Sequence, residues 1–288
     1  LKLISSKNLE NFKIKKKFDL VIAEGFLNTL VNRKKYFKKL ISFLNFQGSL
    51  IINYDDNYGV VFEFIKSIIL LKACELKKTD FTGNNSLKIA KYFFYKEFRK
   101  LKSSRKFSAW FKDQLVNPYA SKVWSLKDIL KLCQNTNLYL YSTSPIFDDS
   151  KNFKWYKNVN LRKNNIKDKN NLFLKSWEKN FNSFIFNDSN LQKTKINNVI
   201  LKDLEKFVSQ IGKFIFIGKI NKKLIEPKKF LKYLEFNGKK KLSTEIKKTI
   251  KYINSCKSER KLYAYYNSTT ELKKTWGSVL HYAALIKS

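Results

Sequence analysis

The fold is decided by the stretch Phe18-Asp-Leu-Val-Ile-Ala-Glu-Gly25 and, one helix length later, by Asn45-Phe-Gln-Gly-Ser-Leu-Ile-Ile-Asn-Tyr-Asp-Asp56. Each stretch contains an uninterrupted apolar run, which predicts a strand buried on both faces. The segment between them is long enough for a helical crossover, and parallel strands need such a crossover. We therefore predict a parallel βαβ unit near the start of the chain.

The segment between the two predicted strands has the pattern of an amphipathic helix. Its apolar residues recur at helical spacing, and lysines fill the opposite face. Asn32 stands ahead of them as the expected N-cap. Gly48 is the expected left-handed residue that ends the helix, although Asn45 could share that role. The apolar positions are Tyr36, Phe37, Leu40, Ile41 and Leu44.

Acidic residues follow both predicted strands, at the edge where open parallel sheets bind their ligands. Glu24 precedes Gly25. Glu24 could belong to a ligand site or, equally, place a negative charge at the N-terminus of a helix. Asp55 and Asp56 could act as a base, but we favour their capping a helix that begins near Asn57. Adjacent strand residues point to opposite faces, so a carboxylate pair for glycoside cleavage is not expected.

Composition indicates a globular protein with a strong excess of lysine. The 288 residues are 43% hydrophobic and 16% aromatic, enough for one large or two modest domains. A net charge of +36 ordinarily indicates nucleic acid or an anionic membrane as partner. However, only five of the 59 basic residues are arginine, the residue best suited to phosphate recognition. Lysine, asparagine, isoleucine and phenylalanine rise together, as in AT-rich genes, so we favour a solvated lysine surface over a nucleic-acid groove.

Several classes of protein are disfavoured by single residue types. Cys74, Cys133 and Cys256 are far apart and form no CxxC pair, which argues against a disulfide framework or zinc site and for a cytoplasmic location. The most apolar long segment, 60–76, is interrupted by charged residues, so no membrane span is expected. His281 is the only histidine, and we expect no metal site.

Further helices and strands are predicted along the rest of the chain. Ser125-Leu-Lys-Asp128 is a capping-box pattern that begins a helix. Asparagine-lysine runs such as 163–171 are typical of exposed loops. Other helices are expected around 60–71, 89–98, 230–234 and 246–253, and strands at 138–141, 214–217 and 276–287.

The order of these elements resembles class I S-adenosylmethionine-dependent methyltransferases. Phe18-Asp-Leu-Val-Ile22 with Glu24-Gly25, and Gln47-Gly-Ser-Leu-Ile-Ile52, are similar to the family's fourth and fifth strands. The helix from Ser125, the strand at Leu138 and the strand around His281 would then match the late helix, the sixth strand and the antiparallel seventh strand. The family's usual proline-glycine-glycine step is here Asn45-Phe-Gln-Gly48.

Other segments resemble a bacterial subgroup of these enzymes that carries large helical insertions. They are Trp110 to Pro118, Ser142-Thr-Ser-Pro-Ile-Phe147 with Trp155-Tyr156-Lys157, and Trp276-Gly-Ser-Val-Leu-His281.

The resemblance implies an α/β fold with a Rossmann-like methyltransferase sheet whose first strands are missing, because the glycine-rich turn would precede Leu1. It implies a core at 1–145 with a helical insertion at about 60–120. An accessory α+β region, which would contact the substrate, occupies 146–274. The segment 275–288 returns to the sheet as its last strand.

The resemblance also implies S-adenosyl-L-methionine as cofactor. Ser5 and Ser6 would follow the third strand beside the adenine, and Glu24 and Gly25 would complete the donor site. Because the glycine-rich turn is absent, an inactive fragment is one expected outcome.

The expected function is methyl transfer to a small molecule or glycan-type acceptor. Alignment of donor and acceptor supplies most of the catalysis, and no metal is obligatory. Where the acceptor is a hydroxyl, the candidate bases are Asp55, Asp56 and His281, although an ordinary core histidine is the favoured interpretation of the last. The alternatives are a lysine-rich nucleic-acid-binding protein and an RNA methyltransferase, which would need lysines clustered beside the strand ends.

Overall fold

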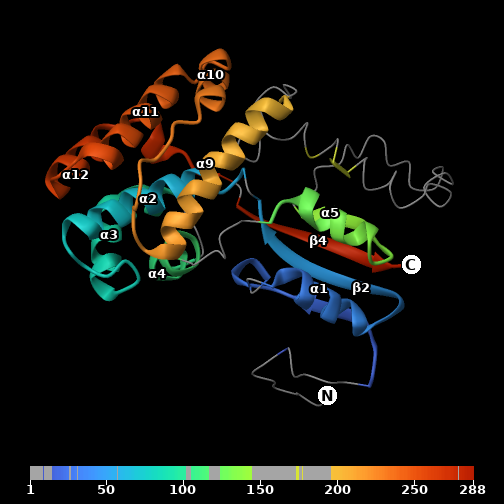
Figure 1. Cartoon of the computed structure of the whole chain (residues 1–288). Coiled ribbons are helices and arrows are strands. Elements are labelled where there is room, and N and C mark those ends of the chain that lie inside the picture. The colour runs from blue at the N-terminus through green and yellow to red at the C-terminus, as the bar shows by residue number, and fades with distance from the viewer. Residues whose placement is uncertain are drawn as a thin grey trace. The chain divides into compact units, whose positions relative to one another are not determined.

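The computed structural model contains two compact units, one built around a sheet and one of helices (Figure 1). The first unit comprises 1–56, 124–180 and 280–288, and the second comprises 57–123 and 181–279. The residues that the structure describes are 9, 15–25, 27–30, 32–56, 58–101, 105–116, 124–144, 173–174, 177, 196–277 and 279–288.

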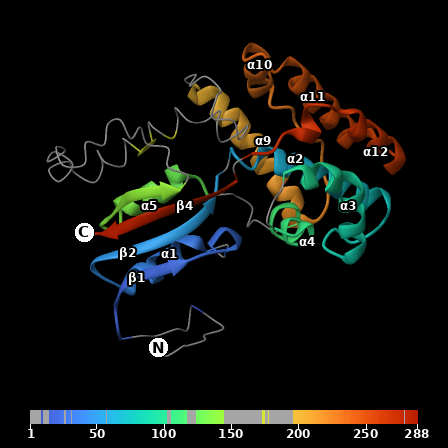
Figure 2. The same ribbon diagram turned by 180° about the vertical axis from the view of Figure 1, so that it is seen from behind.

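The first unit has a four-stranded mixed sheet in the order β1-β2-β4-β3 (Figures 1 and 2). β1 (Phe18–Ala23) and β2 (Leu44–Asp55) are parallel neighbours, as predicted, and α1 (Arg33–Ser42) connects them. β4 (Leu280–Lys287) is antiparallel both to β2 and to β3 (Leu138–Ser144). The β2–β4 pairing begins at Asp55 and Leu280, so the chain leaves and re-enters this unit at adjacent positions. The unit is therefore a mixed α/β structure.

α1 buries the apolar stripe that its sequence predicts. Phe37, Leu40 and Ile41 are buried, whereas Leu44, expected on the same helix face, is the first residue of β2. Asn32 occupies the N-cap position, but its side chain makes no capping hydrogen bond. The helix therefore depends on packing against the sheet more than on its cap.

The prediction that Gly48 ends this helix in a left-handed conformation is wrong. α1 ends at Ser42, and the left-handed residue is Gln47, with φ 59°. Gly48 lies within β2, where a Cβ would come 3.0 Å from the carbonyl oxygens of Asn45 and Phe18. The position therefore needs glycine because two backbone segments approach it closely.

One face of the sheet is covered by helices. Leu50, Ile52 and Leu285 share this face through the strand register, and all three are buried. α5 (Leu126–Gln134) begins with the predicted capping box, in which the Ser125 hydroxyl accepts from the Asp128 N–H at 3.2 Å. Trp124, just before α5, meets the ring of Phe37 edge-on with centroids 6.0 Å apart, so α1 and α5 cover the same face.

The other face exposes apolar side chains. Leu20 and Ile22 of β1 are 52% and 61% exposed, and Leu280 and Tyr141 of the neighbouring elements are also open to solvent. The prediction of burial on both faces is therefore wrong for β1. β1 lies at the margin of the sheet, where Figure 2 labels it, and its outer edge pairs with no strand in the described ranges.

The described residues of the second unit form helices. α2 (Val61–Leu76) is buried along almost its whole length, because α3 (Asn84–Lys100), α9 (Asn198–Ile217), α11 (Lys240–Ser255) and α12 (Glu259–Ser268) pack around it. The other elements are α4 (Phe107–Trp110), the π-helical turn η2 (Phe111–Leu115), α10 (Lys228–Phe236) and the 3₁₀ turn η4 (Leu272–Lys274); the 3₁₀ turn η1 (Leu27–Thr29) belongs to the first unit. None of the helices in the described ranges has the length and apolar composition needed to traverse a bilayer.

The predicted strand at 214–217 is wrong, because these residues form the last turn of α9. Phe214 and Ile215 continue a buried helical stripe that includes Phe207 and Ile211, whereas Phe216 and Ile217 lie on the exposed side of the helix. Gly218, with φ +71°, ends the helix. A short apolar run has no periodicity of its own, so the longer helical pattern that contains it determines the secondary structure here. Pro118, 145–157 and 163–171, which also carried predictions, lie outside the described residues.

Candidate functional site at the strand ends

The exit of β1 is tied to β2 through a glycine. Gly25 has φ +81°, a conformation that favours glycine, and its N–H donates to Asn53 Oδ1 at 2.6 Å. Apart from its two chain neighbours, no atom of the described residues lies within 4 Å of the position that a Cβ on Gly25 would take. The turn after β1 is thus held in place while the space beside its backbone stays open.

Glu24 lies on the sheet face that exposes Leu20 and Ile22, by the alternation of strand side chains. Its side chain is exposed, and its carboxylate accepts a hydrogen bond from the hydroxyl of Tyr282 in β4. Tyr282 is opposite Asn53 in the β2–β4 register. Three neighbouring strands therefore contribute polar groups to one patch, which we call the Glu24 patch: Glu24, Gly25, Asn53 and Tyr282.

Tyr54 and His281 lie on the covered face and are fully buried. They are opposite each other in the register, and their rings meet edge-to-face with centroids 5.5 Å apart. Burial, and next the charge of Asp56, raise the pKa of Tyr54 well above its usual value. This packing agrees with the interpretation of His281 as a core histidine and gives it no opening to solvent.

Asp56 is also fully buried, and it accepts a hydrogen bond from Trp177 Nε1 at 2.9 Å. The prediction that Asp55 and Asp56 cap the following helix is wrong, because α2 begins at Val61 with Val60 as its N-cap. Asp56 instead anchors a tryptophan from a distant part of the chain.

Asp55 lies near the buried guanidinium of Arg33. Arg33 donates to the carbonyl oxygens of Leu30 at 3.0 Å and Asn28 at 2.8 Å. Burial lowers the pKa of Arg33 to about 10, and the charges of Asp128 and Asp55 oppose this shift. Asp55 therefore helps to keep a desolvated cation charged behind the strand ends.

The strand ends thus separate into an exposed and a buried part. The exposed Glu24 patch offers a carboxylate, a phenol and an open glycine backbone, which can bind hydroxyl groups of a ligand. Asp55, Asp56 and His281 are buried, and their assignment as bases stays a prediction. Among the described residues no cluster of three or more histidine, cysteine or acidic side chains could hold a metal ion. Ser5 and Ser6 lie outside the described residues.

Sequence reasoning missed four members of this region: Asn53, Tyr282, Arg33 and Trp177. Asn53 could have been found, because it precedes the acidic pair by two residues on a predicted strand. Tyr282 and Trp177 meet their carboxylate partners across 258 and 121 positions of sequence, which no local pattern reveals.

Comparison of the chain with protein-family models, with curated proteins and with solved structures gives no match in any of the three.

We expect Trp177→Phe to lower the free energy of unfolding by about 1–2 kcal/mol, because it removes a hydrogen bond to a buried carboxylate. Urea unfolding followed by far-UV circular dichroism measures this loss. Asp56→Asn, introduced into the wild type and into the Trp177→Phe variant, completes a double-mutant cycle. A coupling near zero would mean that the contact contributes only packing.

Proposed function

We propose that the chain is part of an S-adenosylmethionine-dependent methyltransferase and that the Glu24 patch is on the donor side of its site. The observation that carries the proposal is the sheet. β1 and β2 are parallel neighbours whose exits carry an acid with a glycine turn and two further acids, and the last strand is antiparallel to both its neighbours. These are the directions that the resemblance assigns to the fourth, fifth and seventh strands.

The Glu24 patch suits the ribose and amino-acid portions of a nucleoside donor. A carboxylate accepts hydrogen bonds from hydroxyl groups, and the Tyr282 hydroxyl holds the Glu24 side chain in position. The open space beside Gly25 allows a ligand to approach the backbone. Ligands of open α/β sheets lie at this edge, outside the carboxyl ends of the strands.

S-adenosylmethionine supplies an activated methyl group on a sulfonium, whose displacement leaves a neutral thioether. The protein mainly has to align the acceptor and exclude water, and the acceptor that we propose is a small molecule or a glycan. Behind the strand ends, the charge of Asp55 favours the charged form of Arg33, and Asp56 holds Trp177 by a hydrogen bond. A requirement for a base would arise only with a hydroxyl acceptor.

The exposed face of the sheet supports the view that the Rossmann-like sheet continues beyond β1. Parallel strands are normally covered on both faces, yet Leu20 and Ile22 are more than half exposed. We infer that a further strand pairs with the outer edge of β1 and that a helix covers these two side chains. Such additions would also complete the donor site.

Calorimetric titration with S-adenosylhomocysteine tests the proposal. We expect saturable binding that Glu24→Ala weakens about tenfold, which corresponds to about 1.4 kcal/mol. Asp19→Ala is the matched control, because Asp19 is an exposed carboxylate at the opposite end of β1 that accepts from Asn45 Nδ2 at 2.7 Å. Absence of saturable binding to the folded chain, or an equal loss in the Asp19 variant, would contradict the proposal.

A further inference from the structure

The exposed side of α3 combines cations with tyrosines at helical spacing. Lys88, Tyr92, Tyr95 and Arg99 form one stripe, and all four side chains are exposed. The stripe spans 12 residues from Lys88 to Arg99, and its two ends lie roughly 16 Å apart along the helix axis. Lys91 and Lys96 flank it. We call the surface formed by Lys88, Lys91, Tyr92, Tyr95, Lys96 and Arg99 the α3 platform.

The two tyrosines are held in place by other rings. Tyr92 stacks on Tyr263 of α12, with centroids 3.8 Å apart and planes 24° apart, and is still 58% exposed. Tyr95 meets Phe107 edge-to-face at 5.4 Å and is 43% exposed. The Arg99 guanidinium lies 6.0 Å from the Tyr95 ring centroid. The rings are thus positioned before any ligand arrives, which lowers the entropic cost of binding.

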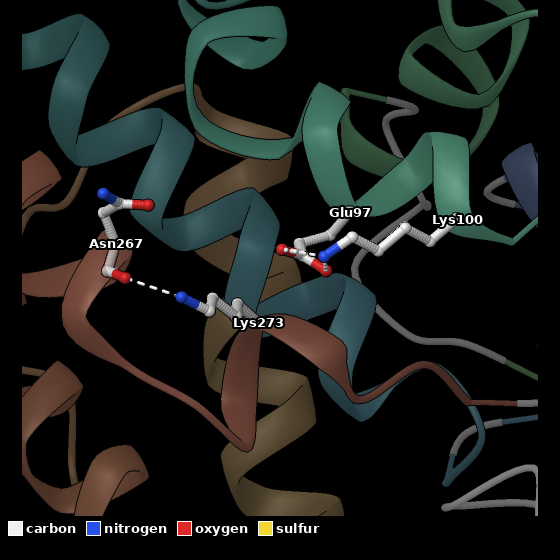
Figure 3. A network of polar contacts seen from close by, with 4 residues as sticks. All are labelled: Glu97, Lys100, Asn267 and Lys273. Atoms are coloured by element: carbon white, nitrogen blue, oxygen red, sulfur yellow. Dashed lines mark hydrogen bonds and ion pairs between the residues drawn. The ribbon is translucent and has the colours of Figure 1, made fainter.

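No acidic residue of α3 lies among the side chains of the α3 platform. The single acid of α3 is Glu97, which is buried and pairs with Lys100 at 2.9 Å (Figure 3). Figure 3 also shows Lys273, which donates to the Asn267 carbonyl at 2.7 Å and so has a partner within the protein. The platform therefore differs from the parts of this unit where a lysine is matched by an internal acceptor.

Elsewhere in the helical unit, carboxylates are engaged internally and leave much of the positive charge uncompensated. Glu245 accepts from the backbone N–H groups of residues 270–272, and Asp203 accepts from those of Lys229 and Phe230. Glu235 pairs with Lys247 at 2.6 Å. A polyanion would restore the balance of charge at an exposed basic surface.

We propose that the α3 platform binds single-stranded nucleic acid, with bases stacked on Tyr92 and Tyr95 and phosphates beside the lysines and Arg99. Rigid, exposed rings interleaved with cations are the arrangement that recognises unpaired bases. A sulfated polysaccharide would use the cations without the rings. A bilayer surface would favour large aliphatic side chains, and the stripe contains none. This inference does not rest on the proposed methyltransferase function.

Fluorescence anisotropy with a labelled 12-nucleotide oligouridine tests the proposal on the whole chain. Tyr92→Ala with Tyr95→Ala should weaken binding at least tenfold, whereas the two phenylalanine variants should bind like the wild type. Lys88→Gln, Lys91→Gln and Lys96→Gln together should reduce the slope of log affinity against log salt by about 2. Circular dichroism checks that each variant is folded.

The matched control carries Lys240→Gln, Lys241→Gln and Lys248→Gln, three exposed lysines of α11 that lie outside the platform. It should keep wild-type affinity. Equal losses of affinity in the two triple-lysine variants would show that binding depends on positive charge spread over the whole surface, and this would overturn the proposal. Unchanged binding by the double alanine variant would do the same, as would tighter binding to heparin or to anionic vesicles than to oligouridine.

Discussion

Replacing Gly277 with alanine should destabilise the protein by about 3 kcal/mol, at the upper end of overpacking substitutions. A Cβ at this position would lie 1.9 Å from the carbonyl oxygen of Gly59 and 2.9 Å from its carbonyl carbon. Both atoms belong to backbone, which cannot rotate away as a side chain can. One of the two segments must therefore move, and Gly59 is only two residues ahead of α2, the buried helix of this unit.

Urea unfolding followed by circular dichroism measures this effect. The matched control is Gly83→Ala, because the three atoms nearest to its Cβ would all belong to the side chain of Asp80, the nearest at 3.2 Å. We expect the control to lose less than about 1 kcal/mol, mainly as a weakened N-cap of α3. Equal transition midpoints for wild type and Gly277→Ala would contradict the predicted close approach.

The second large effect is a pH-dependent gain in stability that Lys66→Met should abolish. Lys66 on α2 is fully buried, donates to the Thr275 carbonyl at 2.7 Å, and places its ammonium 4.0 Å from the Trp276 ring centroid. Burial lowers the pKa of Lys66 to about 8, and the charge of the neighbouring Glu63 opposes this shift.

Stability depends on pH here because the folded and unfolded states bind different numbers of protons at Lys66. Below pH 8 the lysine is charged in both states, and the folded state bears the full desolvation cost. Between about pH 8 and pH 10.5 the unfolded chain keeps a proton that the folded protein has released, so stability rises with pH. The shift corresponds to about 3 kcal/mol in total, of which we expect about 2 kcal/mol between pH 7.5 and pH 10.

The measurement is the difference in free energy of unfolding between wild type and Lys66→Met at several pH values. Subtracting the variant's free energy of unfolding from that of the wild type removes the contributions of other groups that titrate in this range. Burial also raises the pKa values of Cys133 and Tyr265 to about 12. These two groups lower the stability at pH values where they ionise in the unfolded chain but not in the folded protein. Lys248→Met, at an exposed position on α11, should run parallel to the wild type. If the free energy of unfolding of Lys66→Met also changed with pH in the same way as that of the wild type, the buried-amine explanation would be refuted.

The parallel strand pair could be predicted because its information is local. The apolar runs at 20–23 and 50–52 predict two strands, although β1 is not buried on both faces. The pattern from Ser125 to Asp128 specifies both partners of a capping box. The left-handed residue after α1 could not be predicted, since Gln47 adopts a backbone conformation that its side chain does not favour.

The candidate site was only partly predictable. Glu24 and Gly25 follow from their place after a strand, and the structure brings both into one exposed patch. The burial of Asp55 and Asp56 depends on which segments cover the strand ends. The Trp177 contact of Asp56 joins parts of the chain that no short-range pattern relates.

At one end of the ladder between β2 and β4, Asp55, where the polypeptide leaves the sheet unit, pairs with Leu280, where it comes back. Within the helical unit, Gly59 and Gly277 likewise touch. A module whose entry and exit coincide can be gained or lost during evolution with little disturbance to its host, in the way that circular permutants tolerate relocated ends. The sheet unit can therefore accept helical insertions of different lengths between β2 and β4 without a change in its strand order.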